Sequence, residues 1–589
     1  MASSLTMPDG GAAPVAWGPA PRRRWAAPDR TIVPVICLVG VLALLTIPPL
    51  VSLLQASLRE VTPTGALGRF SLASYRDLLA DKRLAEALVA SFEYAIGSAA
   101  LAICAGGLLA WLVERTNTPF KSLAHIAAIV SLGTPYILYV SAWLYLLGRA
   151  GPVNDILKAL LNGPRPVFNV YSMTGMILVE GFLWSPLAFL LLSSVFRSAN
   201  ADFEEAARMC GASVMRTFAQ VSLRLALPAV AAVVLLIVVR SLESFEVPAL
   251  VGLPGGVKVL TTDIYLDMNR TVPPALGRAS AFSVVLLGVA GVLLYFYARL
   301  SRNSARFHTV TGRSFRPRMF DLGRWRWLAA AIVLFDVLIL LLIPTAALLW
   351  LSLMPYQQGI SLAGLKAMTL ANYQVVLHSA FYLDLVWKTL VMGAGAATLV
   401  MLLTVMAGWL TVRHRPWAWL LDQLAMLPLV FPGIVLGVAM IQIYLALPVP
   451  IYGTLTAFVV AFAIRYMPYG MRYATSGLLQ IHPELEEAAA MSGGSLTLVL
   501  RRVVIPLTQP AIVSGWLFIF LVAARDVSLA VILASPAAQP VAVAMFDLWG
   551  NGQGTELAAF GLAWTAMMTV IASGLYLVGR RLGGGAFGV

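Results

Sequence analysis

Side chains that could perform covalent or redox chemistry are sparse and scattered in this chain of 589 residues. The five histidines are dispersed, and Cys37, Cys104 and Cys210 are too irregularly placed for a metal site or a disulfide framework. Residues 252–258 (GLPGGVK) look superficially like a phosphate-binding loop, but no Gly precedes Lys258 and neither Ser nor Thr follows it. No other stretch supplies a Walker motif. We therefore predict a chain that catalyses no reaction and binds neither a metal nor a cofactor of its own.

A repeated acidic stretch is the strongest candidate for a functional element. Residues 204–228 read EEAARMCGASVMRTFAQVSLRLALP, and residues 486–510 read EEAAAMSGGSLTLVLRRVVIPLTQP. A shift of 282 positions superimposes the two stretches without a gap. The matching residues are then Glu204, Glu205, Ala206, Ala207, Gly211 and Pro228 with Glu486, Glu487, Ala488, Ala489, Gly493 and Pro510. Repetition at so long a period indicates two copies of one domain.

Each copy is predicted to form a short helix with an acidic, small-residue face. Asp202 stands three residues before Glu205, which is a capping-box spacing, and Pro483 suits a first helical turn in the second copy. Gly211 and Gly493 permit a sharp turn into a second short helix. Small side chains allow another surface to approach closely, and the carboxylates offer charge-assisted contacts. A solvated amphipathic loop would explain one such copy, but two copies in register favour a docking element.

The composition places these stretches in a membrane protein. Apolar residues make up 60% of the chain and charged residues 12%, whereas soluble domains carry about 25% charged residues. The net charge of +14 would also suit a nucleic-acid-binding protein. We reject that alternative because the arginines flank apolar runs and do not form a stripe with interleaved aromatic residues.

Twelve apolar runs have the length of a membrane-spanning helix, which is roughly 20 residues. We expect six spans at residues 31–56, 89–113, 122–148, 173–196, 227–249 and 279–299, and six more at residues 327–353, 385–411, 418–447, 454–480, 508–533 and 556–579. The predicted fold is an all-α polytopic membrane protein of two parallel, pseudo-symmetric repeats. The breaks Gly133-Thr134-Pro135 and Phe431-Pro432-Gly433 should kink or partly unwind the third span of each repeat.

The distribution of arginine predicts the orientation and the domain limits. Residues 302–326 hold seven arginines and one acid, Asp321, so this segment should be cytoplasmic. Six spans per repeat then place both termini and both acidic stretches in the cytoplasm. Loop 57–88 fits less well, although its four acids offset most of its five basic residues. The predicted units are a disordered cytoplasmic tail (1–30), a first membrane domain (31–301), a basic linker (302–326) and a second membrane domain (327–589).

Charged side chains within the predicted spans are candidates for a polar pathway, because a charge in a bilayer is costly and usually serves a function. The residues that we single out are Glu93, Glu180, Arg240, Glu243, Glu246, Asp336, Lys388, Arg465, Arg525 and Asp526. The 282-residue shift places Arg525 on Glu243, and these two could form an ion pair between the repeats. The predicted lining of a translocation pathway is Glu243, Glu246, Arg525 and Asp526. The alternative for each is an interhelical pair or a position at the membrane edge.

The repeated stretch resembles the Glu-Ala-Ala loop of type I ABC-importer permeases. The second copy fits that pattern throughout, whereas the first has Arg224 at the position of the last proline. The fitting residues of the second copy are Glu487, Ala488, Ala489, Gly493, Val503, Ile505 and Pro506. The resemblance implies that the ten aligned Glu, Ala and Gly residues form two coupling helices, each seated in a groove of a cytoplasmic ABC ATPase. It also implies two copies of that ATPase, which bind the ATP, a periplasmic substrate-binding protein, and a bacterial inner membrane.

A single chain with both repeats is similar to the ferric-iron permeases of that family. Residues 241–250 and 259–265 are similar to the fifth span and the following loop of those proteins. The implied function is transport of ferric iron from the binding protein to the cytoplasm by alternating access. Fused permeases for thiamine, polyamines and phosphonates share this architecture and remain alternatives. An ion-coupled secondary transporter is an alternative of a different class, but it leaves the two acidic loops unexplained.

Overall fold

The computed structural model describes residues 32–61, 67–161, 166–198, 202–304, 319–413 and 415–582. In these ranges the chain is almost entirely helical, apart from a short antiparallel pair of strands, β1 (Arg59–Val61) and β2 (Leu67–Phe70). The predicted all-α fold is confirmed. The predicted tail and most of the predicted linker, at residues 305–318, lie outside the described residues.

The helices follow one another in two series. The first repeat contains α1 (Ile32–Ser57), α2 (Ala73–Ala80), α3 (Lys82–Arg115), α4 (Lys121–Gly133), α5 (Tyr136–Leu147), α6 (Pro152–Leu161), α7 (Met173–Ser198), α8 (Asp202–Met209), α9 (Val214–Thr217), η1 (Phe218–Ser222), α10 (Leu223–Glu243), η2 (Pro248–Gly252), η3 (Leu253–Gly255), α11 (Leu260–Asn269) and α12 (Leu276–Ser304). The second contains η5 (Gly323–Trp325), α13 (Arg326–Val337), η6 (Leu338–Leu342), α14 (Ile343–Ser352), α15 (Leu362–Lys366), α16 (Ala371–His378), α17 (Ala380–Val412), α18 (Trp419–Met426), η7 (Leu427–Val430), α19 (Gly433–Ala446), α20 (Leu455–Leu479), α21 (Pro483–Met491), α22 (Leu496–Val499), η8 (Leu500–Val504), α23 (Ile505–Ala523), α24 (Ala530–Leu533), α25 (Val541–Gly550) and α26 (Gly554–Leu582).

Nine helices in the described ranges are long and apolar enough to cross a membrane, and two bent helix pairs raise that number to eleven. Each of them coincides with one of the predicted spans. The remaining predicted span, 454–480, coincides with α20, whose Arg465 and Arg472 lower its hydropathy. The described structure therefore supports a multi-pass arrangement in which each predicted span contains a long helix or a bent pair of helices.

The third predicted span of each repeat is two helices joined at a sharp bend. The helices on either side of Pro135 meet at 104°, and those on either side of Pro432 meet at 107°. Thr134 and Phe431 precede these prolines and are extended, with ψ of 136° and 112°. The proline ring disfavours a helical backbone at the residue before it, and it also lacks the N–H that would continue the helix. The predicted breaks are therefore full bends.

The fifth predicted span of each repeat ends earlier than expected. α10 ends at Glu243 instead of residue 249, and α23 ends at Ala523 instead of residue 533. Pro248 has no N–H to donate to the Ser244 carbonyl, which accepts a hydrogen bond of 2.9 Å from the Thr261 hydroxyl instead. Polar residues that follow each helix end therefore lie in or beside irregular backbone.

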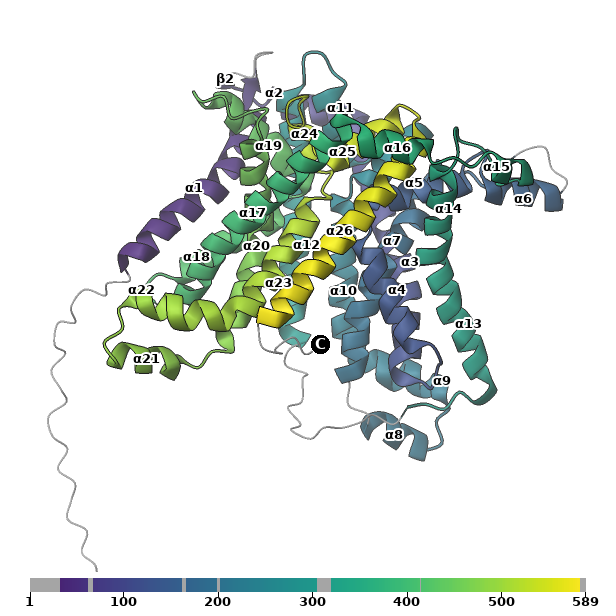
Figure 1. The fold of residues 1–589 in the computed structure, drawn as a ribbon, viewed down its shortest axis with the longest axis horizontal. Coiled ribbons are helices and arrows are strands. Elements are labelled where there is room, and N and C mark those ends of the chain that lie inside the picture. The colour runs from purple at the N-terminus through teal and green to yellow at the C-terminus, as the bar shows by residue number, and fades with distance from the viewer. Residues whose placement is uncertain are drawn as a thin grey trace, which may run out of the picture.

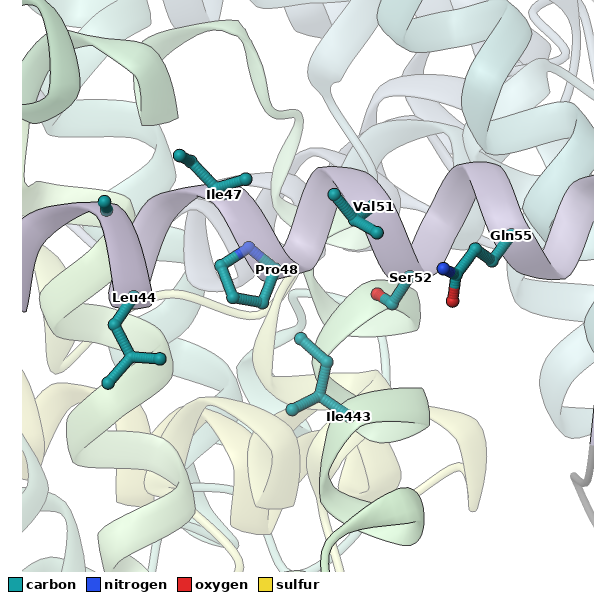
Figure 2. A pocket seen from close by; sticks show the side chains of 8 residues that line it. Leu44, Ile47, Pro48, Val51, Ser52, Gln55 and Ile443 are labelled. Carbon is teal, nitrogen blue, oxygen red and sulfur yellow. The ribbon is translucent and has the colours of Figure 1, made fainter. Parts of the chain in front are cut away.

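The first span of each repeat packs against the other repeat. α1 lies along α18 and α19, and the Ser52 hydroxyl donates to the Ala439 carbonyl at 3.3 Å. A shallow apolar hollow of about 460 Å³ lies beside this contact, lined by residues of α1 and by Ile443 (Figure 2). On the other side α13 packs on α4, and α14 packs on α5. The repeats interlock in space, so the domain limits drawn along the sequence stay a prediction.

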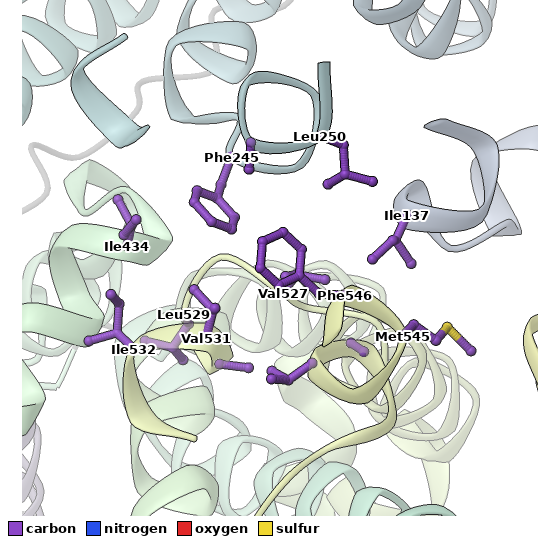
Figure 3. Packing of buried hydrophobic residues seen from close by; sticks show 14 of the residues in the cluster. Ile137, Phe245, Leu250, Ile434, Val527, Leu529, Val531, Ile532, Met545 and Phe546 are labelled. Atoms are coloured by element: carbon purple, nitrogen blue, oxygen red, sulfur yellow. The ribbon is translucent and has the colours of Figure 1, made fainter. Parts of the chain in front are cut away.

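The largest buried cluster is shared by both repeats (Figure 3). Phe245 and Leu250 of the first repeat lie in one cluster with Ile434, Val527 and Phe546 of the second. The rings of Phe245 and Phe546 are 5.7 Å apart between centroids. This packing holds the two repeats against each other.

Both acidic stretches lie at the same end of the molecule. In Figure 1, α8 and α21 are at the lower edge, whereas α11, α24 and α25 are near the upper edge. The end of α26 is also towards the lower edge. This placement agrees with the expectation that both stretches lie on one side of the membrane.

Candidate functional site

The two acidic stretches fold alike. Each begins with a short helix, α8 or α21, and passes through a glycine turn into a second short helix, α9 or α22. Gly211 and Gly493 have φ of 84° and 87°, a left-handed backbone that residues with a Cβ rarely adopt. Each turn is closed by an N–H···O bond of 3.0 Å, from Ala212 to Ala207 and from Gly494 to Ala489. The predicted helix, glycine turn and second helix are present in both copies.

The starts of the two short helices differ. Pro483 lies in the first turn of α21, as expected, and His482 precedes the helix as its N-cap residue. The side chain of Asp202, which the spacing predicts as a cap for α8, lies outside the described part of the structure. Only the proline-based prediction can therefore be compared with the fold.

Both short helices present the same face to solvent. Glu205 and Glu487 are exposed, as are Ala206 and Ala488. Each helix also exposes two large apolar side chains at matching positions: Phe203 (57%) and Met209 (89%) in α8, and Leu485 (51%) and Met491 (90%) in α21. Exposed apolar side chains next to a carboxylate form a surface suited to a protein partner.

Glu204 and Glu486 point the other way, into the protein. Glu204 is 4% exposed and forms an ion pair with Arg115 at the end of α3. Glu486 forms an ion pair of 2.5 Å with Arg413, directly after α17. The ten predicted coupling residues therefore do not make up a single surface, because an arginine of each repeat holds one of these carboxylates inward.

The end of the linker contacts both α3 and α8. The Phe320 N–H donates to the carbonyl of the last α3 residue at 2.8 Å, and its ring centre lies 5.5 Å from the Arg208 guanidinium of α8. Asp321 accepts hydrogen bonds from the Gly323 N–H at 2.9 Å and the Asn117 amide at 2.6 Å. These two donors hold the pKa of Asp321 below its usual range. The linker thus ends in an ordered contact that joins α3 and α8.

A cavity of about 380 Å³ lies between the two repeats. Most of its lining residues form pairs related by the 282-residue shift. These pairs are Leu183 and Arg465, Trp184 and Tyr466, Leu187 and Tyr469, Leu236 and Phe518, Arg240 and Val522, Glu243 and Arg525, Ser244 and Asp526, and Glu246 and Ser528. Residues at the two bends complete the lining: Leu132, Tyr136, Pro428, Leu429 and Phe431. The cavity therefore lies between equivalent positions of the two repeats, although the paired side chains differ in chemistry.

The four residues predicted for a pathway all line this cavity, together with Arg240 and Arg465. Arg240 forms an ion pair of 3.2 Å with Glu243 and donates to the Tyr469 hydroxyl of the other repeat at 2.6 Å. Arg465 forms an ion pair of 2.9 Å with Asp526. The charges of the cavity are therefore largely satisfied by neighbours.

Arg525 does not pair with Glu243 in the described structure, so that expectation is wrong. Its guanidinium donates to the Leu132 carbonyl near the end of α4 and lies 4.8 Å from the ring centre of Tyr136. The carbonyls at a helix C-terminus attract a cation, and this bend supplies them beside Arg525. Glu243 instead forms its ion pair with Arg240, three residues earlier on the same helix.

The other predicted charges are distributed around the cavity or away from it. Glu246 accepts from the Phe245 N–H at 3.3 Å, and Glu180 lies behind the lining, where it accepts from the Trp184 indole at 2.9 Å. Glu93, Asp336 and Lys388 are not among the lining residues. In the ranges that the structure describes, no group of three or more His, Cys, Asp or Glu side chains could hold a metal ion.

Sequence reasoning missed the cavity tyrosines and the arginines that hold the short helices. The 282-residue shift could have indicated the cavity tyrosines. It aligns Tyr466 with Trp184, another aromatic residue, at the same position of the fourth span in each repeat. A second repeat could have indicated the arginines. The pattern Trp-Leu-x-x-Arg occurs at residues 111–115 and again at residues 409–413, 298 positions later.

Comparisons with known proteins find similarity to transport permeases. Residues 102–303 match the family model described as binding-protein-dependent transport system inner membrane component. A protein of Sinorhizobium fredii named as an ABC transporter permease is 26% identical over 547 residues, which cover 91% of this chain and 93% of that protein. The ferric transport system permease protein FbpB of Actinobacillus pleuropneumoniae is 25% identical over 80% of this chain and 68% of that protein.

Shorter matches were also found. A protein of Salmonella typhimurium named for 2-aminoethylphosphonate transport, PhnU, is 28% identical over 39% of this chain and 81% of that protein. A solved bacterial ABC transporter involved in the import of the acidic polysaccharide alginate is 15% identical, with a TM-score of 0.35 over 44% of this chain and 96% of that chain. Residues 102–303 therefore match the binding-protein-dependent transport permeases, and proteins named as ABC transporter permeases are similar to this chain over most of its length.

Proposed function

We propose that this ABC-importer permease moves ferric iron, and that two copies of a separate ABC ATPase dock on α8 and α21 to drive it. The observation that carries the proposal is the matched outer face of the two short helices at one end of the molecule. Two copies of one partner are expected to require two such faces. The similarity to a ferric transport permease over four fifths of the chain supports the cargo.

The docking face combines a carboxylate with apolar contacts. In each short helix one exposed glutamate, Glu205 or Glu487, lies next to small alanines, which let a partner approach the backbone. The methionine at the helix end, Met209 or Met491, is almost fully exposed and adapts its shape to a partner's groove. A groove with an apolar floor and a basic rim is the partner surface that fits.

Transport requires that ATPase closure favour one arrangement of the repeats over another, because a ligand shifts an equilibrium only through differential contacts. Two contacts at the cavity cross between the repeats: Arg240 with Tyr469, and Arg525 with the Leu132 carbonyl. Rocking the repeats apart would break both. They would therefore stabilise one state of an alternating-access cycle, with the cavity as its pathway.

We place the end that carries α8 and α21, and both chain termini, in the cytoplasm. The arginine-rich linker supports this orientation. A periplasmic binding protein then delivers its solute at the opposite end, near α11, α24 and α25. An aminophosphonate is the alternative candidate for the cargo. The similarity to PhnU over part of the chain favours it over thiamine and polyamines.

Docking is tested by reversing the exposed charges. We expect Glu205→Arg combined with Glu487→Arg to reduce co-purified ATPase at least ~10-fold, because hydrogen bonds to charged groups contribute about 1.5–3 kcal/mol each. The measurement is the ATPase-to-permease ratio after purification in mild detergent.

A charge-matched control is available at the other end. Glu60→Arg with Asp77→Arg changes the net charge equally on exposed residues of β1 and α2. This control should retain the ATPase. Normal co-purification with the Glu205/Glu487 variant would reject the docking assignment.

The cargo is tested by uptake in a strain that lacks the gene and in the same strain with the gene restored. Labelled ferric iron, 2-aminoethylphosphonate, thiamine and a polyamine are compared, with ATP-depleted cells as the control. Gene- and ATP-dependent uptake of iron supports the proposal. Uptake of another solute alone would replace the cargo, and uptake driven by an ion gradient without ATP would reject the mechanism.

A further inference from the structure

The inward face of α8 ends on a charged contact with a long helix. Glu204 binds Arg115, the last residue of α3, and accepts a second hydrogen bond of 2.6 Å from the Ser222 hydroxyl. The side chains of Arg115 and Glu204 are only 2% and 5% exposed. Because it is buried and bound by Arg115 and Ser222, the Glu204 carboxylate is not accessible to a docked partner.

The inward face of α21 repeats this contact in the second half. Glu486 binds Arg413 through Nη2 and Nε at 2.5 and 2.9 Å, and it accepts from the Trp409 indole at 3.0 Å. Arg413 directly follows α17 and also donates to the Ile481 carbonyl at 3.1 Å, at the start of the α21 segment. Each short helix is thus fixed to the end of one long helix by a carboxylate–guanidinium pair.

The pair recurs although the chain between its partners changes in length. The Trp-Leu-x-x-Arg pattern repeats at 298 positions, whereas the short helices repeat at 282 positions. The segments between them therefore differ by 298 − 282 = 16 residues. A contact that survives such a difference in both copies reflects a requirement of the fold or of its action, and not the register of one stretch.

The long helices lead from these contacts to the cavity. α3 packs along α7 and α10, and α17 packs along α20 and α23. The cavity is lined by residues of α7, α10, α20 and α23 and by the segments that follow α10 and α23. A displacement of α3 or α17 would therefore also displace the helices that line the cavity.

We infer that Glu204 and Glu486 are positioning residues that tie the coupling helices to α3 and α17, so that ATPase motion reaches the cavity through these two long helices. The inference rests on the proposed function of α8 and α21 as docking elements. It assigns the outward glutamates, Glu205 and Glu487, to ATPase binding and the inward ones to transmission.

The chemistry of the pair suits transmission. Buried ion pairs do not in general stabilise a protein more than apolar residues of the same size would. A guanidinium does, however, fix the direction of its partner through several N–H donors, which a compact apolar contact does not. The expected function of the pair is therefore to keep the angle between a short helix and a long one.

The test uses the second repeat, where the pair is less buried and folding is at lower risk. In a background with Cys37, Cys104 and Cys210 replaced by Ser, Ser528→Cys places one thiol in the cavity lining, and its labelling rate reports opening. Purified permease with its co-purified ATPase is compared without nucleotide and with ATP and vanadate. The variants are Glu486→Gln, Arg413→Glu, both charges swapped (Arg413→Glu with Glu486→Arg), and Glu487→Gln.

We expect at least a ~5-fold nucleotide-dependent change in labelling for the parent protein. Glu486→Gln should retain the ATPase but reduce this change to less than ~2-fold, and the swapped pair should restore it. Glu487→Gln should instead lower the amount of bound ATPase. A full labelling change in Glu486→Gln, or loss of ATPase from it as from Glu487→Gln, would overturn the inference. Failure of the parent to retain any ATPase would reject the proposed function and the inference with it.

Discussion

The two short helices α8 and α21 have nearly the same sequence and the same exposed face, but their inward contacts with the protein differ. In the first repeat the Arg115–Glu204 side chains are 2% and 5% exposed, and the Phe320 N–H of the linker donates to the Arg115 carbonyl. In the second repeat the Arg413–Glu486 side chains are 12% and 13% exposed. Equal motifs therefore have unequal surroundings.

The cause of the difference is topological. The chain contains a single linker between its repeats, and that linker returns to the membrane beside the end of α3, where Phe320 forms a bridge with Thr116. The end of α17 leads directly into α18 within the same repeat. The linker thus lies beside the ion pair of α8, which is more deeply buried than the ion pair of α21. If two identical ATPase subunits dock on α8 and α21 as proposed, the two helices should respond to them unequally.

Removal of the inward carboxylates should reveal the difference most strongly. Glu204→Ala should lower the free energy of unfolding by about 3–5 kcal/mol, because it leaves the Arg115 guanidinium buried without its carboxylate. Glu486→Ala should cost less, about 1.5–3 kcal/mol, because Arg413 keeps the Ile481 carbonyl and some access to water. The measurement is the apparent melting temperature of each variant in the same detergent.

A compensating variant distinguishes a lost pair from a lost side chain. Glu204→Leu with Arg115→Met removes both charges and should recover most of the stability lost in Glu204→Ala. Equal melting temperatures for the two alanine variants would show that burial by the linker does not strengthen the first pair.

The bends of the two repeats offer a second comparison. A methyl group added at Gly433 would overlap the Arg465 guanidinium, which its ion pair with Asp526 prevents from moving away freely. Gly433→Ala should therefore destabilise by about 1–3 kcal/mol through overpacking and should also disturb the cavity. At Gly133 an added methyl would meet no heavy atom of the described residues within 4 Å. Gly133→Ala should therefore change the free energy of unfolding by less than about 0.5 kcal/mol. Melting curves of both variants check this, and similar losses would contradict it.

Local patterns in the sequence were enough for the helices and their breaks. Apolar runs predict the spans, prolines predict the bends at Pro135 and Pro432, and glycines predict the turns at Gly211 and Gly493. These features depend only on residues that are close together in the sequence, so they can be predicted without the tertiary structure.

Partner choice among the charged residues was not readable in the same way. The sequence aligns Glu243 with Arg525, but Arg240 is closer to Glu243 on the same helix, and the bend offers Arg525 free carbonyls. The inward direction of Glu204 depends on Arg115, 89 residues earlier in the chain. Such contacts are decided by three-dimensional packing, and only an internal repeat such as Trp-Leu-x-x-Arg carries a trace of them.

The glycine turns should respond equally in the two repeats. Gly211→Ala and Gly493→Ala each place a Cβ on a left-handed backbone, at an expected cost of about 1–2 kcal/mol. Hydrogen exchange of α8 and α21 should increase by the same factor in the two variants. Substitution by Asn, which tolerates this backbone better, should have a smaller effect. Unequal responses would show that the turns, and not only their attachments, differ between the repeats.

The smallest expected effect isolates the linker. Phe320→Leu keeps an apolar side chain of similar size in a position that is 2% exposed, but it removes the ring that faces Arg208. A cation–π contact at a surface contributes about 0.5–1 kcal/mol, so hydrogen exchange of α8 should rise by roughly 2- to 5-fold while that of α21 stays unchanged. A rise in both helices would mean that the linker acts on the whole end of the molecule that carries α8 and α21. No rise in either would leave burial of the Arg115–Glu204 pair as the sole source of the asymmetry, since the pair remains enclosed when the ring is lost.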